Sequence, residues 1–79
     1  MRRRTTILTQ LQKNILEFAK AECFHGTLND FIARTGVPEE DALTALKDLR
    51  SKHIVSMPPS LLTSWIGVTN YGWRVMGWK

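Results

Sequence analysis

The residues able to carry acid–base, thiol or metal chemistry are few in this 79-residue chain, and their spacing keeps them apart. Cys23 and His25 stand two positions apart, which suits neither a zinc pair nor a thiol nucleophile with a separately placed base. The run Glu39-Glu40-Asp41 points neighbouring side chains about 100° apart on a helix, so they do not converge on a shared proton. His53 is isolated near a helix end, where capping or solvation is common. We therefore expect no enzyme, no metal site and no cofactor.

Cationic side chains are better candidates for a functional site, because they are grouped. The N-terminal arm Arg2, Arg3 and Arg4 supplies three of the four net positive charges, so the rest of the chain is nearly neutral. Such an arm either binds phosphates or a nucleic-acid groove, or is a solvated terminus that aids solubility, and the sequence leaves both open. The other cations able to meet a polyanion are Lys47, Arg50, Lys52 and Arg74.

Length and composition indicate one folded domain at residues 6–79, preceded by a flexible basic arm at residues 1–5. An apolar fraction of 43% is enough for a packed core. Cys23 cannot form an internal disulfide alone, so it is expected as a small buried hydrophobe in a reduced compartment. No segment is apolar enough to span a membrane, and none follows the arginines as a signal peptide would require. A cytoplasmic protein is expected, or one of the host cytoplasm if the source is viral.

The first element that must position these side chains is a helix from Thr6 to Glu22. Its apolar residues fall on one face at three- and four-residue spacing: Leu8, Leu11, Ile15, Phe18 and Ala19. The opposite face carries Gln12, Lys13, Glu17 and Lys20. His25-Gly26 is expected to end this helix, with the glycine as the stop.

A second helix opens at Thr27, which is a good N-cap and has Asp30 three residues later to complete a capping box. Gly36 is expected in a left-handed turn. The third helix runs from Pro38 to Lys52, with acidic residues in its first turn that suit the helix dipole. Its buried stripe is predicted to be Ala42, Ala45, Leu46 and Leu49.

Two β-strands are predicted beyond the third helix, at residues 54–57 and 64–68, joined by a loop from Pro58 to Thr63. Thr69 can cap a short final helix, although Gly72 and Gly77 weaken it. Trp65 and Trp73 are expected to complete the core against the first helix. Trp78 is harder to bury, so Trp73 and Trp78 are also candidates for a homodimer or partner contact.

Three helices followed by a two-stranded hairpin resemble a winged helix-turn-helix domain. The pattern Thr27-Leu28-x-x-Phe31-Ile32-Ala33-x-x-Gly36-Val37 is similar to its second helix, and Ala42-x-x-Ala45-Leu46-x-x-Leu49-x-x-x-His53-Ile54-Val55 to its recognition helix and first wing strand. The segment from Trp65 to Gly72 resembles the ending of many small bacterial, archaeal and phage regulators. The resemblance covers nearly the whole chain and implies an α+β fold with a β-wing.

The same resemblance implies sequence-specific binding of double-stranded DNA by a transcriptional regulator or a phage or plasmid accessory factor. The third helix would enter the major groove, and the loop from Pro58 to Thr63 would reach a minor groove. Thr27 would contact a phosphate, and Arg50 and Lys52 would lie near the backbone. The positions facing base edges would be Pro38, Glu39, Glu40, Leu43, Thr44 and Lys47.

A winged helix that binds protein is the alternative. The acidic start of the third helix opposes a polyanion, and the wing loop has no Lys or Arg. Leu61 and Leu62 in that loop, together with the tryptophans from Trp65 to Trp78, would then form an exposed apolar and aromatic surface typical of interface cores.

Overall fold

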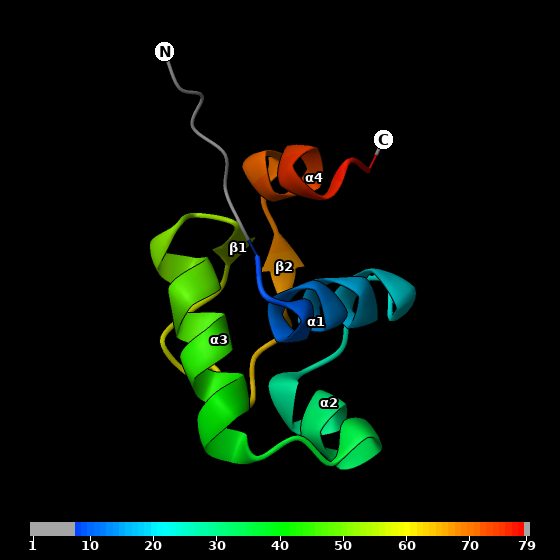
Figure 1. Ribbon diagram of the computed structural model, residues 1–79, viewed down its shortest axis with the longest axis vertical. Coiled ribbons are helices and arrows are strands. Elements are labelled where there is room, and N and C mark those ends of the chain that lie inside the picture. The colour runs from blue at the N-terminus through cyan, green and yellow to red at the C-terminus, as the bar shows by residue number, and fades with distance from the viewer. Residues whose placement is uncertain (1–7, 79) are drawn as a thin grey trace.

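The computed structural model describes residues 8–78, which form four helices and one two-stranded antiparallel sheet (Figure 1). The α+β class and the order of elements match the prediction from the sequence. The predicted arm with Arg2, Arg3 and Arg4 lies outside the described residues. The elements are α1 (Gln10–Ala21), α2 (Leu28–Thr35), α3 (Glu39–Ser51), β1 (Val55–Ser56), β2 (Gly67–Val68) and α4 (Asn70–Met76).

Helix α1 begins at Gln10 instead of Thr6, because a capping box fixes its start. The Thr9 hydroxyl accepts a hydrogen bond of 3.1 Å from the Gln12 backbone N–H, and the Gln12 side-chain oxygen accepts one of 3.0 Å from the Thr9 N–H. Two orphan donors of the first turn are thereby satisfied. The prediction overlooked this local signal.

The end of α1 also differs from the prediction. Cys23 and Phe24 adopt left-handed backbone conformations, with φ of 56° and 62°, so two non-glycine residues turn the chain. Gly26 is not the stop. A Cβ at that position would lie 2.8 Å from the Phe18 ring, so glycine is needed there for close packing. Cys23 itself is exposed, and its expected burial is wrong.

The signals around α2 and α3 are confirmed. Thr27 and Asp30 form both hydrogen bonds of a capping box, at 3.2 and 3.3 Å. Gly36 takes a left-handed φ of 74° and ends α2. Pro38 and Lys52, predicted as the first and last residues of α3, are instead its N-cap and C-cap, because the helix runs from Glu39 to Ser51. The four buried residues of α3 are those predicted: Ala42, Ala45, Leu46 and Leu49.

The hairpin is shorter than predicted, and its loop folds back on the body. Val55 pairs with Val68 and Ser56 with Gly67, while Trp65 makes only an isolated bridge to Thr27. Leu61 is only 6% exposed, and the Leu62 carbonyl accepts a hydrogen bond from the Asn29 N–H at 3.2 Å. Leu61 therefore belongs to the core, which contradicts the expected exposed apolar loop.

Helix α4 lies directly on the hairpin because Gly72 has no side chain. The Thr69 hydroxyl caps the helix by accepting from the Gly72 N–H at 3.0 Å, as predicted, and it also donates to the His53 carbonyl at 2.6 Å. A Cβ on Gly72 would collide with the Ile54 carbonyl oxygen. Gly72 therefore lowers the helix propensity of α4 but allows this helix to pack against the hairpin.

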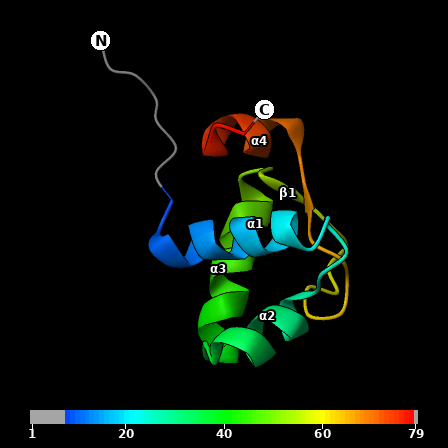
Figure 2. The same cartoon turned by 90° about the vertical axis from the view of Figure 1, so that its right-hand side faces the viewer.

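The core lies where α1 crosses the space between the other elements. Helix α1 contacts α2, α3 and β2, and α3 contacts α2 and β1, so α3 forms one flank of the molecule (Figures 1 and 2). The largest fully buried side chains come from α1, α2, α3 and the residues that precede the two strands: Ile15, Leu16, Leu28, Phe31, Leu46, Leu49, Ile54 and Ile66. Among the described residues, no helix has the length and apolar character needed to cross a membrane.

Candidate nucleic-acid interface

The outward side of α3 carries the predicted base-facing residues. Glu40, Thr44 and Lys47 are exposed and follow one another at spacings of four and three residues, so they lie along one stripe of the helix. Leu43 is half-buried beside this stripe and packs against the core. Pro38 and Glu39 are exposed at the helix start. The structure therefore brings these side chains to one flank of the protein.

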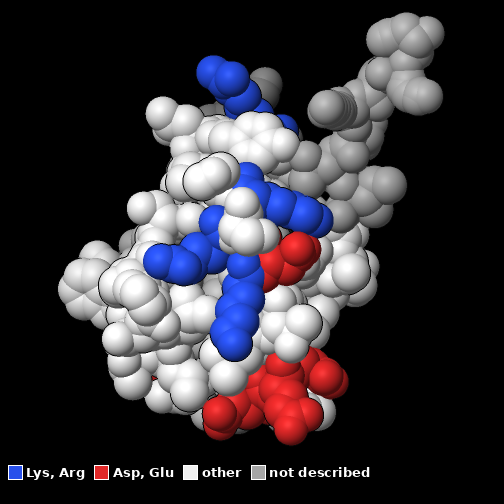
Figure 3. All heavy atoms as spheres, turned by 90° about the vertical axis from the view of Figure 1, so that its left-hand side faces the viewer, with Lys and Arg blue, Asp and Glu red and all other residues white. Residues whose placement is uncertain are grey.

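Charge is divided along this flank. The acidic residues Glu39, Glu40 and Asp41 occupy the first turn of α3, whereas Lys47, Arg50 and Lys52 follow in its last turns and at its C-cap. Figure 3 shows one group of Asp and Glu side chains gathered at one end of the face and the Lys and Arg side chains toward its middle, where a smaller acidic group lies among them. A polyanion would meet favourable charge only over the C-terminal half of the helix.

The three cations differ in how they are held. Arg50 donates from Nε to the Met57 carbonyl at 3.0 Å, which ties the guanidinium to the chain after β1. Lys52 forms an ion pair with Asp48 at 3.0 Å. Within residues 8–78 the Lys47 side chain forms neither an ion pair nor a hydrogen bond, so its charge is fully available.

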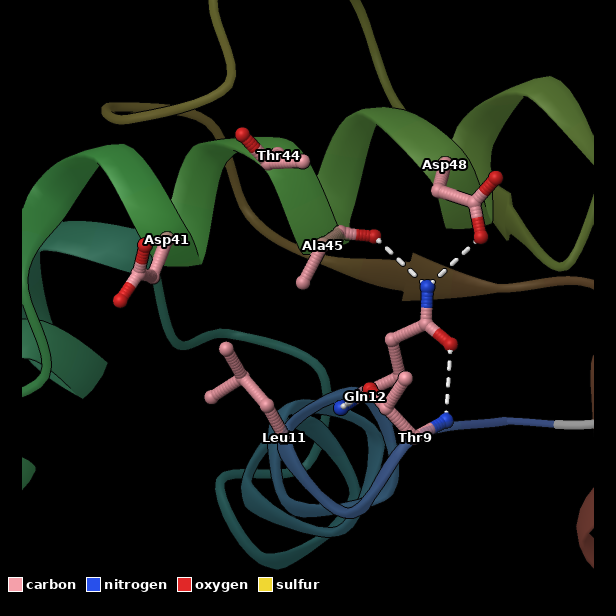
Figure 4. Close-up of a pocket in the computed structure, with 7 residues that line it drawn as sticks. All are labelled: Thr9, Leu11, Gln12, Asp41, Thr44, Ala45 and Asp48. Carbon is pink, nitrogen blue, oxygen red and sulfur yellow. Dashed lines mark hydrogen bonds between the residues drawn. The ribbon is translucent and has the colours of Figure 1, made fainter.

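Gln12 connects α1 to the back of this helix, which the sequence analysis missed by assigning it to the solvent face. It is 4% exposed, and its amide donates to the Asp48 carboxylate at 2.7 Å and to the Ala45 carbonyl at 3.4 Å. Figure 4 shows this amide bridging the two helices at a groove of about 530 Å³. Hydrogen bonding from Gln12, followed by that from Lys52, lowers the pKa of Asp48 below its ordinary value of 3.8.

No family model matches the chain, and no curated protein or solved structure matches it either.

A second hollow lies where α3 passes into β1, and it contains residues that the sequence analysis did not select. This cleft of about 400 Å³ is lined by Arg50, Ser51, His53, Val55, Ser56 and Met57. His53 has a left-handed φ of 61°. The sequence offers no signal for this conformation, since no glycine or asparagine marks the position.

Thr27, the predicted phosphate contact of α2, is engaged within the protein. Its hydroxyl accepts from the Asp30 N–H, and the neighbouring Asn29 N–H donates to Leu62 in the returning loop. Two N–H groups that could face an anion at this helix start are therefore already paired. The position remains half-buried beside the bridge to Trp65.

The aromatic residues include a packed group and two exposed side chains, Trp65 and Tyr71. Trp73 and Trp78 are half-buried, with ring centroids 5.5 Å apart, and Lys20 Nζ lies 4.8 Å from the Trp78 ring centroid. Trp65 is 62% exposed and stacks near His25, so its expected place in the core is wrong. Trp78 packs within the chain against Trp73 and Lys20 but stays half-buried. Trp73 is also only half-buried and lies outside the core cluster, so its expected place in the core is wrong as well.

The described residues contain no cluster suited to a metal ion. Across residues 8–78, no group of three or more His, Cys, Asp or Glu side chains is arranged to hold one. Other surface features of residues 8–78 are the charged flank of α3, the cleft at its end and the exposed side chains of Trp65 and Tyr71.

Proposed function

We propose that this protein is a winged helix-turn-helix protein that binds double-stranded DNA through the outward flank of α3. The observation that carries the proposal is the stripe of exposed Thr44 and Lys47 on a helix whose opposite side is packed, with Arg50 and Lys52 exposed near its C-terminal end. An α-helix presented in this way fits the width of the major groove. Regulation of transcription is the role that the resemblance implies.

The charge division changes how the helix would approach the duplex. Phosphate neutralisation dominates the affinity of most DNA-binding proteins, so the basic C-terminal half of α3 would lie nearest the backbone. Glu39 and Glu40 would then be limited to base edges, where a carboxylate accepts a hydrogen bond from cytosine N4. Arg2, Arg3 and Arg4 would add contacts that do not depend on base sequence.

The test is a titration of labelled random-sequence duplex at several salt concentrations, followed by fluorescence anisotropy. We expect affinity to fall steeply with salt, and Lys47→Ala to make the slope of log K against log salt shallower by about one unit. Lys13→Ala is the matched control, because Lys13 is an exposed α1 cation without an ion pair or side-chain hydrogen bond in the described chain. Absence of binding at low salt would contradict the proposal.

Binding of a protein partner is the second candidate function, and the exposure of Trp65 favours it. Among the described residues, the exposed large hydrophobic side chains are those of Trp65 and Tyr71, at 62% and 45% exposure. Aromatic residues of this kind are enriched in interface cores. Sedimentation of the wild type and of Trp65→Ala over a concentration series tests a homodimer: the wild type would associate and the variant would not.

A further inference from the structure

The cleft at the end of α3 combines donors that suit a phosphate group. Arg50 reaches it from the helix, His53 from the turn and Ser56 from β1, around a hollow of about 400 Å³ that Ser51 also lines. The Ser51 hydroxyl itself donates to the Asp48 carbonyl. Guanidinium, imidazole and hydroxyl groups all donate hydrogen bonds to anions. No carboxylate is among the residues that line the cleft.

Arg50 is held in place before any ligand arrives. Its Nε donates to the Met57 carbonyl at 3.0 Å, which fixes the orientation of the planar guanidinium. Neither terminal nitrogen of this group forms a hydrogen bond or ion pair with another described residue. Two free donors on a fixed plane match the geometry of phosphate oxygens.

His53 is locked in a conformation that side chains disfavour. Its φ of 61° lies in the left-handed region, where Cβ crowds the carbonyl oxygen. The His53 N–H donates to the Arg50 carbonyl at 3.1 Å, and its own carbonyl accepts from the Thr69 hydroxyl at 2.6 Å. Backbone strain of this kind is concentrated at functional positions, which supports a functional role for the His53 imidazole.

A helix C-terminus ordinarily repels an anion, but here the carbonyls of Asp48, Leu49 and Arg50 are already hydrogen-bonded. The Asp48 carbonyl accepts from the Lys52 N–H and the Ser51 hydroxyl, and the Leu49 carbonyl accepts from the Ile54 N–H. The Asp48 carboxylate is paired with Lys52 and hydrogen-bonded by Gln12. The Asp48 carboxylate and these three carbonyls are therefore compensated, which reduces the repulsion that an anion would meet at this helix end.

We propose that Arg50, His53 and Ser56 form a site for one phosphate group of the DNA backbone. This inference rests on the proposed function and adds His53 and Ser56 to the contacts that the resemblance implies. The site would lie beyond Lys47 on the same flank of α3. A phosphate seated there would set how far α3 advances into the groove, because backbone contacts position a protein on the duplex.

His53→Gly separates binding from stability. Removing Cβ relieves the left-handed strain, so the variant should be at least as stable as the wild type, yet it should bind random duplex about threefold more weakly through loss of one hydrogen bond. Arg50→Gln should weaken binding about tenfold and make the salt slope shallower by about one unit. The matched control is Cys23→Gly, which relieves a left-handed φ of 56° at an exposed position and should bind as the wild type does.

Titration with inorganic phosphate, followed by amide chemical shifts, probes the cleft without DNA. Shifts grouped at residues 50–56 and absent from Arg50→Gln would support the site. Duplex binding unchanged in both His53→Gly and Arg50→Gln would overturn it while leaving the proposed function intact. Phosphate shifts at these residues without any duplex binding would instead reject DNA as the source of the phosphate, together with the proposed function.

Discussion

The Gln12 amide donates a hydrogen bond of 2.7 Å to the Asp48 carboxylate and so joins the first turn of α1 to the last turn of α3. The same side chain accepts from the Thr9 N–H, so one residue both caps α1 and fixes α3 against it. Since α3 carries the proposed DNA-binding flank, the position of that flank depends on a polar contact in an otherwise apolar core.

Gln12→Met should lower the free energy of unfolding by about 1–3 kcal/mol, because it keeps the length of the side chain and removes its polar partners. Urea unfolding followed by circular dichroism measures this loss. Gln10→Met is the control, since Gln10 is exposed and bonds only to Asn14, and it should change stability by less than about 0.5 kcal/mol. Equal stability of the two variants would contradict a structural role for Gln12.

Acidification should weaken the fold partly through Asp48. The Gln12 hydrogen bond, and then Lys52, lower the pKa of Asp48 in the folded protein below 3.8, so the unfolded chain takes up this proton first. The resulting stability is present above the unfolded pKa and is lost as pH falls through the folded one. Asp48→Asn should therefore lose less stability than the wild type between about pH 6 and pH 3, measured by urea midpoints.

Glu17→Gln is the comparison for this experiment, because Glu17 is exposed on α1 and has neither an ion pair nor a side-chain hydrogen bond within the described residues. Its acid dependence should follow that of the wild type. Parallel curves for Asp48→Asn and Glu17→Gln would show that the Gln12–Asp48 contact does not favour the carboxylate.

Replacing Gly72 by alanine should destabilise the protein more than replacing Gly36, although helix propensity alone favours alanine at position 72. Gly72→Ala lies inside α4, where alanine is the better helix former, yet its Cβ would collide with the Ile54 carbonyl and cost about 3 kcal/mol. Gly36→Ala meets no atom within 4 Å and should cost only about 1 kcal/mol for its left-handed φ of 74°. Thermal unfolding of both variants measures the two losses of stability. A smaller loss for Gly72→Ala than for Gly36→Ala would show that α4 does not pack tightly on the hairpin.

Local chemistry explains what the sequence could predict. The capping box of Thr27 and Asp30, the left-handed Gly36 and the buried stripe from Ala42 to Leu49 each depend on residues within one or two turns. These signals fixed α2 and α3, which include most of the candidate site. The outward direction of Thr44 and Lys47 then followed from helical periodicity alone.

The remaining features depend on contacts between distant segments. Gln12 is buried by its contacts with Ala45 and Asp48, which lie 33 and 36 residues later in the chain. Nothing near Gln12 in the sequence indicates these partners. Trp65 is 62% exposed, whereas Leu61, four residues earlier, is buried in the core, and the sequence pattern does not show which of the two packs inward. Likewise, the turn that carries His53 into the cleft is held by a hydrogen bond from Thr69, 16 residues later in the chain.

Neutralising the acidic first turn of α3 should raise DNA affinity while lowering stability. Glu39→Gln combined with Glu40→Gln removes two charges from the proposed binding flank, so affinity for random duplex at low salt should rise about threefold. The same change weakens the favourable interaction with the helix dipole and should cost about 0.3–1 kcal/mol for each charge. Anisotropy titration and urea unfolding of one preparation measure both effects. Unchanged affinity, with the expected loss of stability, would place the duplex away from this end of α3.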